Sequence, residues 1–103
     1  MTRVVWTEPA LADLQGIVDY IGRDSAAYAS SMGEQIVLAV DSLSEFPRRG
    51  RRVPEARSAS ILEIFAGPYR IIYEMRGSTV EVLAIIHGRR NVRSVRRKPW
   101  RRR

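Results

Sequence analysis

Hydrophobic positions in the first part of the chain recur at helical spacing. They are separated by three or four residues, the pattern of an amphipathic helix. The apolar positions are Leu11, Leu14, Ile17, Val18 and Ile21. Thr7 can cap this helix, since a threonine oxygen accepts a hydrogen bond from a free backbone N–H, and Pro9 is tolerated in the first turn. Asp13, Gln15 and Asp19 are expected to face solvent, and the sequence at 22–24 ends the helix.

A second helix is predicted to follow after a few residues. Its apolar stripe consists of Tyr28, Met32, Ile36, Ala39, Val40 and Leu43. Asp24 or Ser25 can cap it, and Pro47 is expected to end it, because the residue before a proline disfavours the helical conformation. The short connection predicts that the two helices form an antiparallel hairpin.

The remaining hydrophobic segments have the length and composition of strands. They comprise a short N-terminal strand at residues 4–6 and three later strands at 60–65, 69–75 and 80–87. Short turns between the last three predict an antiparallel meander. We therefore predict an α+β fold of order β-α-α-β-β-β: an N-terminal strand at a sheet edge and an antiparallel helical hairpin packed on a small antiparallel β-sheet. Residues 1–90 form the single domain, and residues 91–103 form a basic C-terminal tail or short helix.

Charge is distributed unevenly along the 103 residues. The net charge is +7, yet residues 1–88 hold nine arginines against eleven acidic residues, whereas residues 89–103 hold nine basic residues and no acidic one. A cationic tail of this kind favours nucleic-acid phosphates or an acidic protein segment. The alternative is a solvated tail that keeps the protein in solution.

Composition excludes several classes of site. The chain has no cysteine, which excludes disulfides and a cysteine nucleophile and argues against zinc. We expect no metal and no cofactor. There is no signal peptide pattern and no apolar run approaching a membrane span, so we expect a cytoplasmic protein without a membrane partner.

An ordered set of short motifs covers nearly the whole chain. The motifs are Trp6-Thr7 with Ala10 and Asp13-Leu14, then Asp19-Tyr20-Ile21, Phe46-Pro47 with Gly50-Arg51, Tyr69-Arg70-Ile71-Ile72-Tyr73, and His87-Gly88-Arg89-Arg90. In this order they resemble the RelE/ParE superfamily of toxins from type II toxin-antitoxin systems. The His-Gly-Arg-Arg ending is more similar to the ParE branch.

The resemblance implies a toxin neutralised by a cognate antitoxin in a hetero-oligomer. A ParE-like toxin would inhibit DNA gyrase as a binding protein without catalytic residues. The alternative is a RelE-like, ribosome-dependent mRNA endonuclease, in which Glu55, Arg70, His87 and Arg89 would act on RNA without a metal. The lysines and the tyrosine after Arg90 that this branch uses are missing, which favours the gyrase poison. A third possibility is a member that has lost toxicity.

Arg70 is the leading single candidate, because an arginine within an apolar strand needs an anion or an acidic partner. It can contact a phosphate or an acidic protein; alternatively, it can form a structural ion pair with Glu63 or Glu81 on a neighbouring strand. His87, the only histidine, can act as an acid or base, because imidazole exchanges protons near neutral pH.

Two further surfaces are expected to make contacts. Arg70, Arg89, Arg90 and Arg93 are candidates for contact with the target or with phosphate. Tyr20, Tyr28, Arg70 and Trp100 are candidates for antitoxin binding. Trp100, isolated among arginines, can pack back on the body or anchor a partner.

A basic loop precedes the strand meander. Its arginines, at positions 48, 49, 51 and 52, can reach a nucleic-acid backbone, or they can form an ordinary solvated loop. No aromatic residue interleaves with them in the sequence, so a base-stacking platform is not predicted.

Overall fold

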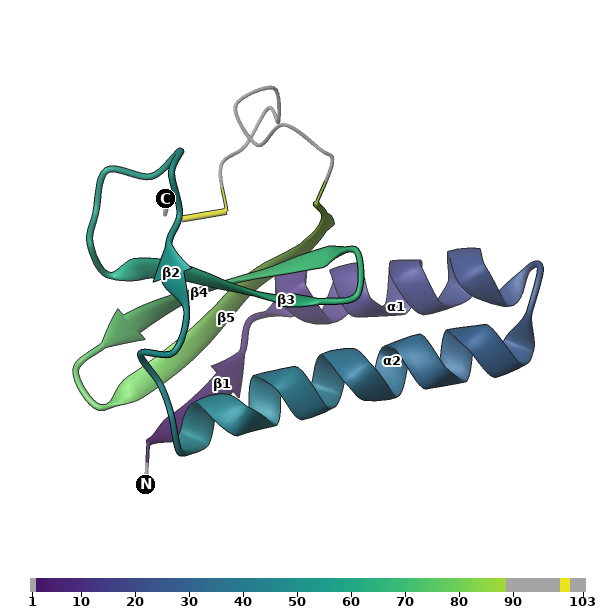
Figure 1. Ribbon diagram of the computed structural model, residues 1–103, viewed down its shortest axis with the longest axis horizontal. Coiled ribbons are helices and arrows are strands. Elements are labelled where there is room, and N and C mark those ends of the chain that lie inside the picture. Colours follow the sequence, from purple (N-terminus) through teal and green to yellow (C-terminus); the bar gives the residue numbers. More distant parts are fainter. Residues whose placement is uncertain (1, 89–98, 101–103) are drawn as a thin grey trace.

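Two helices pack against one face of a five-stranded sheet (Figure 1). The computed structural model describes residues 2–88 and 99–100. The elements in chain order are β1 (Arg3–Trp6), α1 (Glu8–Gly22), α2 (Ala26–Asp41), the 3₁₀ turn η1 (Ser42–Ser44), β2 (Arg51–Arg52), β3 (Ile61–Ala66), β4 (Tyr69–Arg76) and β5 (Thr79–His87). The predicted α+β architecture is confirmed. Of the predicted basic tail or short helix, only residues 99–100 are among the described residues.

Helix α1 is fixed at its start by Thr7. The Thr7 hydroxyl oxygen accepts a hydrogen bond from the N–H of Ala10 at 3.3 Å and donates one to the carbonyl oxygen of Val82 at 2.7 Å. One side chain therefore caps the helix and ties it to β5.

Helix α2 begins where the sequence predicts and ends earlier. Ser25 is its cap, with the hydroxyl oxygen accepting from the N–H of Tyr28 at 3.0 Å. The prediction that it continues to Pro47 is wrong: the helix ends at Asp41, and η1 follows. The Ser42 hydroxyl donates to the carbonyl oxygen of Ala39 at 2.6 Å, a local side-chain bond of the kind that competes with continued helix.

The sheet has the strand order β1-β5-β4-β3-β2. The three long strands form the predicted antiparallel meander. The N-terminal strand lies at an edge, as predicted, and it runs parallel to β5, with Arg3 opposite Thr79 and Trp6 opposite Val82. The opposite edge is β2, two residues long, in the segment that the sequence predicts to be a basic loop.

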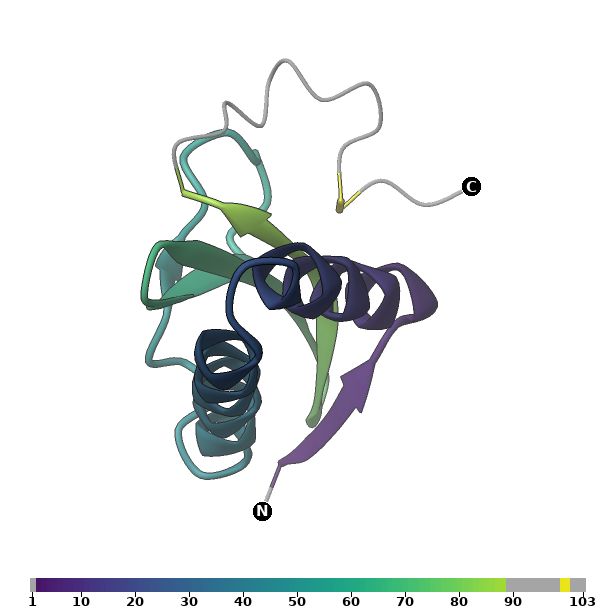
Figure 2. The same cartoon turned by 90° about the vertical axis from the view of Figure 1, so that its right-hand side faces the viewer.

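The helical hairpin covers the main core. Figure 2, turned by 90°, shows α2 nearly end-on and α1 at an oblique angle in front of the sheet. Fully buried residues of α2, such as Ile36 and Val40, pack against Ile71 and Tyr73 of β4 and Val82 of β5. Alternate residues of each strand point to this face, as the pleat requires.

A second, smaller cluster lies on the opposite face of the sheet, here called the outer face. It consists of Val53, Ala56, Ile61, Ile72 and Leu83, with Ile86 and Trp100 packed against it. The segment 53–57 thus covers part of the outer face.

One expected surface residue has a structural role. Asp13 of α1 is predicted to face solvent, and this is wrong: its carboxylate accepts a hydrogen bond from the N–H of Ile85 at 3.0 Å. Pairing between β1 and β5 stops at Val82, so Asp13 supplies the acceptor that the edge strand does not.

In the described part of the chain, no helix is long and apolar enough to cross a membrane.

Candidate functional site

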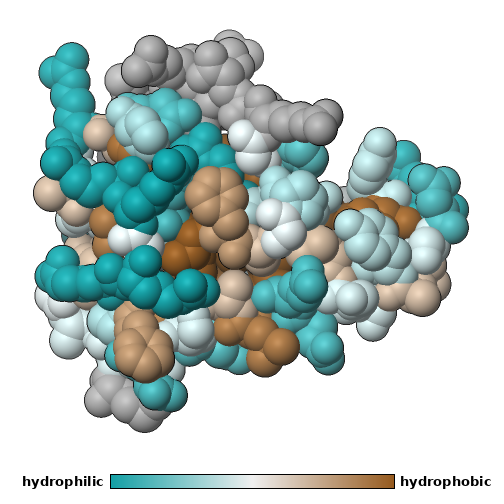
Figure 3. Space-filling view, viewed as in Figure 1, coloured by the Kyte–Doolittle hydropathy of each residue, from teal (hydrophilic) through white to brown (hydrophobic). Residues whose placement is uncertain are grey.

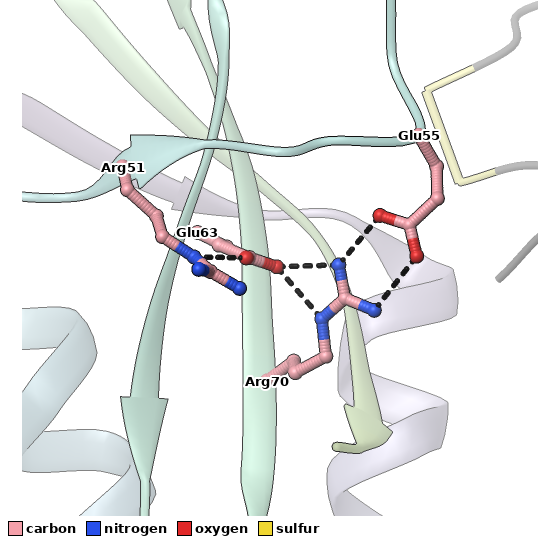
Figure 4. Close-up of polar contacts among 4 residues, drawn as sticks. All are labelled: Arg51, Glu55, Glu63 and Arg70. Carbon is pink, nitrogen blue, oxygen red and sulfur yellow. Dashed lines mark hydrogen bonds and ion pairs between the residues drawn. The ribbon is translucent and has the colours of Figure 1, made fainter. Parts of the chain in front are cut away.

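Arg70 lies in β4 on the outer face and is surrounded by carboxylates (Figure 4). Its Nε donates to Oε1 of Glu63 at 2.7 Å, and its Nη1 and Nη2 donate to the two carboxylate oxygens of Glu55 at 3.2 and 3.0 Å. The side chain is 6% exposed. Every nitrogen of the guanidinium therefore has a carboxylate partner, which is the bidentate geometry that arginine favours.

Glu63 joins Arg70 to a second arginine. Its side chain is completely buried, and its Oε2 accepts from Nε of Arg51 at 2.6 Å. We call Arg51, Glu55, Glu63 and Arg70 the Arg–Glu network. Two positive and two negative charges balance within it, which a buried charge requires.

The network raises the pKa of Arg70. Burial by itself lowers the pKa of the guanidinium, but the hydrogen bonds that it donates to Glu55 and Glu63 and the negative charges of these carboxylates outweigh burial, so the pKa is raised. Arg70 remains charged, and its charge is already matched by protein groups.

Of the two structural partners considered for Arg70, Glu63 is confirmed. It lies diagonally across the β3–β4 ladder, because Arg70 is opposite Phe65 and Glu63 is opposite Ile72. Glu81 pairs instead with Arg76, at 3.7 Å. Contact of Arg70 with a phosphate or a target stays a prediction.

His87 is on the other side of the sheet. It is paired with Tyr69 in the β4–β5 ladder, and the two rings meet edge to face with centroids 5.6 Å apart. Its neighbour Ile86 is opposite Arg70 and packs on the outer cluster. Because successive residues of a strand alternate between faces, the structure brings Glu55 and Arg70 together and places His87 away from them. Arg89 lies outside the described residues, as do Arg90 and Arg93.

Two of the candidate antitoxin residues are on the helical hairpin. Tyr20 and Tyr28 are 67% and 53% exposed. Tyr69, in the adjoining β4, has a raised pKa, caused mainly by burial and to a lesser degree by Tyr28 and Tyr20. Tyr20 and Tyr28 are thus near enough to Tyr69 to raise the pKa of its phenol.

A shallow groove runs along the solvent side of the hairpin. It is lined by residues of both helices, among them Leu11, Val18, Ala29, Gly33 and Val37. Neither Tyr20 nor Tyr28 lines it. The groove is mostly apolar, although polar and charged residues also line it, namely Gln15, Asp19, Arg23, Ser30 and Glu34.

Trp100 is partly buried against the outer cluster. Of the two roles considered for it, packing back on the body is therefore confirmed. The cluster that forms its seat consists of Val53 and Ala56 from the covering segment and Ile61, Ile72 and Leu83 from the sheet. Antitoxin contact by Trp100 stays a prediction.

The structure adds Phe65, which the sequence analysis did not identify as a candidate. The guanidinium of Arg51 lies 5.4 Å from the ring centroid of Phe65, which is 49% exposed. The two are fourteen positions apart in the chain, and the pairing of β2 with β3 brings them together. Strand β2 has only two residues, too few for a periodic pattern in the sequence.

No site for a metal is formed by the residues that the structure describes, in that no three His, Asp or Glu side chains group to hold an ion. The arrangement offers instead a neutralised ionic network, an exposed tyrosine region and an arginine-rich edge.

Comparison with known proteins identifies the family. Residues 4–92 match the family model described as the ParE toxin of the type II toxin-antitoxin system, parDE. The chain is 41% identical over 91 residues to Toxin RelE2 of Caulobacter vibrioides, covering 87% of this chain and 99% of that protein. It is 32% identical over 94 residues to Toxin ParE3 of the same organism, covering 89% and 92%.

Solved structures agree on the fold. A structure titled "Chromosomal ParDE TA system from P. aeruginosa" matches with a TM-score of 0.70 and 23% identity, covering 84% of this chain and 96% of that one. The RelBE2 toxin-antitoxin complex from Mycobacterium tuberculosis matches with a TM-score of 0.54 and 24% identity, over 84% and 96%. On the extent of the family match and the identity of these relatives, the chain belongs to the ParE toxin family of type II toxin-antitoxin systems.

Proposed function

We propose that this toxin arrests growth in the cytoplasm by binding DNA gyrase, and that a cognate antitoxin neutralises it in a hetero-oligomer. Residues 1–90 form the toxin domain in this proposal, and residues 91–103 a basic extension. The observation that carries the choice of gyrase is the Arg–Glu network, in which Arg70 is matched by Glu55 and Glu63.

Metal-free cleavage of RNA needs a proton acceptor, a proton donor and a cation that stabilises the phosphorane. For Arg70 to serve as that cation, it would have to exchange two carboxylates for a phosphate. Glu55 would also have to leave the guanidinium to accept a proton. His87, on the opposite face beside Tyr69, would not reach the same phosphate. These three features favour a toxin that acts by binding.

The antitoxin contact is proposed at the helical hairpin. Tyr20 and Tyr28 present large rings to solvent, and aromatic rings of this kind contribute strongly to protein interfaces. Arg70 is enclosed by its own partners, so its contribution to antitoxin binding would be indirect, through the position of segment 53–57. Trp100 would contribute only if it left its seat on the outer cluster.

An mRNA endonuclease remains the alternative function. It is supported by the name of the relative RelE2 at 41% identity and by the exposed arginines at the β2 edge.

The first experiment uses purified toxin freed of antitoxin, with DNA gyrase, ATP and a closed circular plasmid. Toxin-dependent accumulation of linear DNA, abolished by added antitoxin, is the expected result. Unperturbed supercoiling by a toxin preparation that still arrests growth would overturn the gyrase proposal.

The variant His87→Ala separates the two functions in cells. A gyrase poison keeps most of its toxicity, whereas an endonuclease that uses His87 as acid or base loses about 10²–10⁴-fold in rate. Arg23→Ala changes an exposed residue of the helical hairpin. It is the control for effects of a substitution on expression level and folding.

A further inference from the structure

The edge of the sheet at β2 carries a dense positive charge. Between residues 46 and 60 the chain has five arginines and one acidic residue, Glu55. All five arginines are exposed, at positions 48, 49, 51, 52 and 57. Figure 3 shows the hydrophilic surface gathered on the β2 side of this view, interrupted by hydrophobic groups.

Most of the positive charge at the β2 edge is not paired with a carboxylate of the described residues. Glu55 is directed toward Arg70, and Glu63 is shared between Arg70 and Arg51. Within residues 2–88 and 99–100, the other four arginines form no ion pair with a carboxylate. The Arg–Glu network thus uses Glu55 and Glu63 and, among the described residues, leaves four of the five arginines without a carboxylate in an ion pair.

The loop that carries the arginines is held by hydrogen bonds to the buried side chain of Tyr73. The hydroxyl of Tyr73, a fully buried residue, accepts from the N–H of Gly50 at 3.1 Å and donates to the carbonyl oxygen of Pro47 at 2.8 Å. Arg49 is further held by Ser42, whose hydroxyl accepts from its Nε at 2.8 Å. A ligand would therefore meet side chains on a backbone that is already ordered, which lowers the entropy cost of binding.

Two aromatic rings border the arginines. Phe46 begins the loop and is 60% exposed, and Phe65 is 49% exposed beside the guanidinium of Arg51. The sequence predicts no stacking platform, because no aromatic residue interleaves with the arginines, but the fold places Phe65 of β3 beside Arg51. Exposed aromatic rings beside a cationic track are the combination that binds single-stranded nucleic acid, because bases stack on the rings and phosphates pair with the cations.

We propose that the β2 edge of this protein binds single-stranded nucleic acid. An acidic peptide is the other polyanion that this charge would attract. Such a peptide would add to a sheet edge through backbone hydrogen bonds, but β2 offers only two residues of ladder. A purely acidic peptide would also leave the exposed faces of Phe46 and Phe65 uncovered. The inference concerns a direct contact of the toxin and does not depend on gyrase being the target.

The test measures fluorescence anisotropy of a labelled oligothymidylate of about twelve nucleotides, a length within the usual site sizes of such proteins. Full-length toxin freed of antitoxin is titrated at several salt concentrations between about 50 and 200 mM. The triple variant Arg48→Ala, Arg49→Ala, Arg52→Ala is compared with a control triple, Arg3→Ala, Arg23→Ala, Arg76→Ala. Both remove three exposed arginines and leave the basic residues after position 88 unchanged.

The edge triple is expected to weaken binding at least tenfold more than the control triple. It should also reduce the slope of log affinity against log salt by about 2, since each phosphate contact on a single strand contributes about 0.7. Phe65→Leu should weaken binding several-fold with the slope unchanged, because it removes a stacking face and no charge. Circular dichroism checks that each variant is folded.

Three results would overturn the proposal. Equal losses in the two triples would place the binding in the basic C-terminal residues. Tighter binding of a labelled polyglutamate peptide than of oligothymidylate, with no effect of Phe65→Leu, would assign the edge to an acidic protein segment. An equal affinity for duplex DNA of the same length would show that the rings take no part.

Discussion

The carboxylate of Glu55 accepts hydrogen bonds from both terminal nitrogens of Arg70, at 3.2 and 3.0 Å. The two residues are fifteen positions apart, and only Arg70 lies in a strand. This paired contact fastens the segment 53–57 to the outer face of the sheet. The same segment supplies Val53 and Ala56 to the cluster on which Trp100 packs. A single ionic contact therefore supports both the loop and the seat of the C-terminal tryptophan.

Removing Arg70 should strongly destabilise the fold. Arg70→Ala leaves Glu63 buried with one partner, itself on an exposed side chain, and leaves Glu55 with fewer hydrogen bonds. The expected loss in the free energy of unfolding is about 3–5 kcal/mol, measured by urea denaturation. Arg51→Ala is the matched control, because it removes an arginine from the same glutamate at a side chain that is 64% exposed. Its loss should stay within about 1 kcal/mol. Similar losses in both variants would contradict the assignment of Arg70 as the central group.

Gly50 should not tolerate a side chain. A Cβ there would lie 2.6 Å from Oη of Tyr73 and 2.7 Å from the carbonyl oxygen of Glu63. Both atoms are held in place, so Gly50→Ala should destabilise the protein by about 1–3 kcal/mol. Gly16→Ala is the opposite case: it lies within α1, nothing is within 4 Å of its Cβ, and alanine is the better helix former. That variant should stabilise by about 0.5–1 kcal/mol. A thermal melt of the two variants distinguishes the signs.

Alkaline pH should weaken the fold through Tyr73. Burial raises the pKa of its phenol above the ordinary value of 10.0, and the hydrogen bond from Gly50 and the charges of Arg49 and Arg48 oppose this only in part. A pKa raised in the folded state means that stability is fully present below the unfolded value and is lost as pH rises through the folded value. The free energy of unfolding should therefore fall as pH increases above about 10. Tyr73→Phe should show a smaller fall over the same range, whatever its stability at neutral pH. An unchanged alkaline slope in that variant would assign the effect to other tyrosines.

Trp100 should contribute to stability through its contact with the outer cluster. Trp100→Ala exposes apolar surface of the outer cluster, and the expected loss in the free energy of unfolding is about 1–2 kcal/mol, less than for a fully buried side chain. Phe46→Ala, at a ring that is 60% exposed, should change stability by no more than about 0.5 kcal/mol. Guanidinium denaturation of both variants makes the comparison. A neutral result for Trp100 would mean that its contact with the cluster does not stabilise the fold.

Regular elements were predictable because their signals are local. The stripe that includes Met32, Ile36 and Val40 predicts α2, and all three are buried. The diagonal contact of Arg70 with Glu63 was also foreseeable, since it follows from pairing neighbouring strands. Contacts made by residues outside helices and strands could not be predicted from the sequence. The position of Glu55 depends on the path of a loop, and no periodicity encodes it.

Other differences arise from competition between local and tertiary effects. Asp13 has the spacing of a solvent-facing helical residue, yet an unpaired N–H on β5 attracts it inward. Tyr28 and Leu11 have the spacing of core residues, yet both remain about half exposed, at 53% and 50%. Helical periodicity identifies an apolar stripe, and the width of the facing sheet decides how much of that stripe is covered.

The parallel pairing of β1 with β5 also has a consequence for synthesis. Arg3 lies opposite Thr79, so the first strand made by the ribosome has no partner until the last one emerges. Nonlocal pairing of this kind delays folding until its final participant is present. The sheet therefore cannot be complete before β5 has been made. For a toxin of this family, an interrupted chain that lacks β5 would leave β1 without its partner strand.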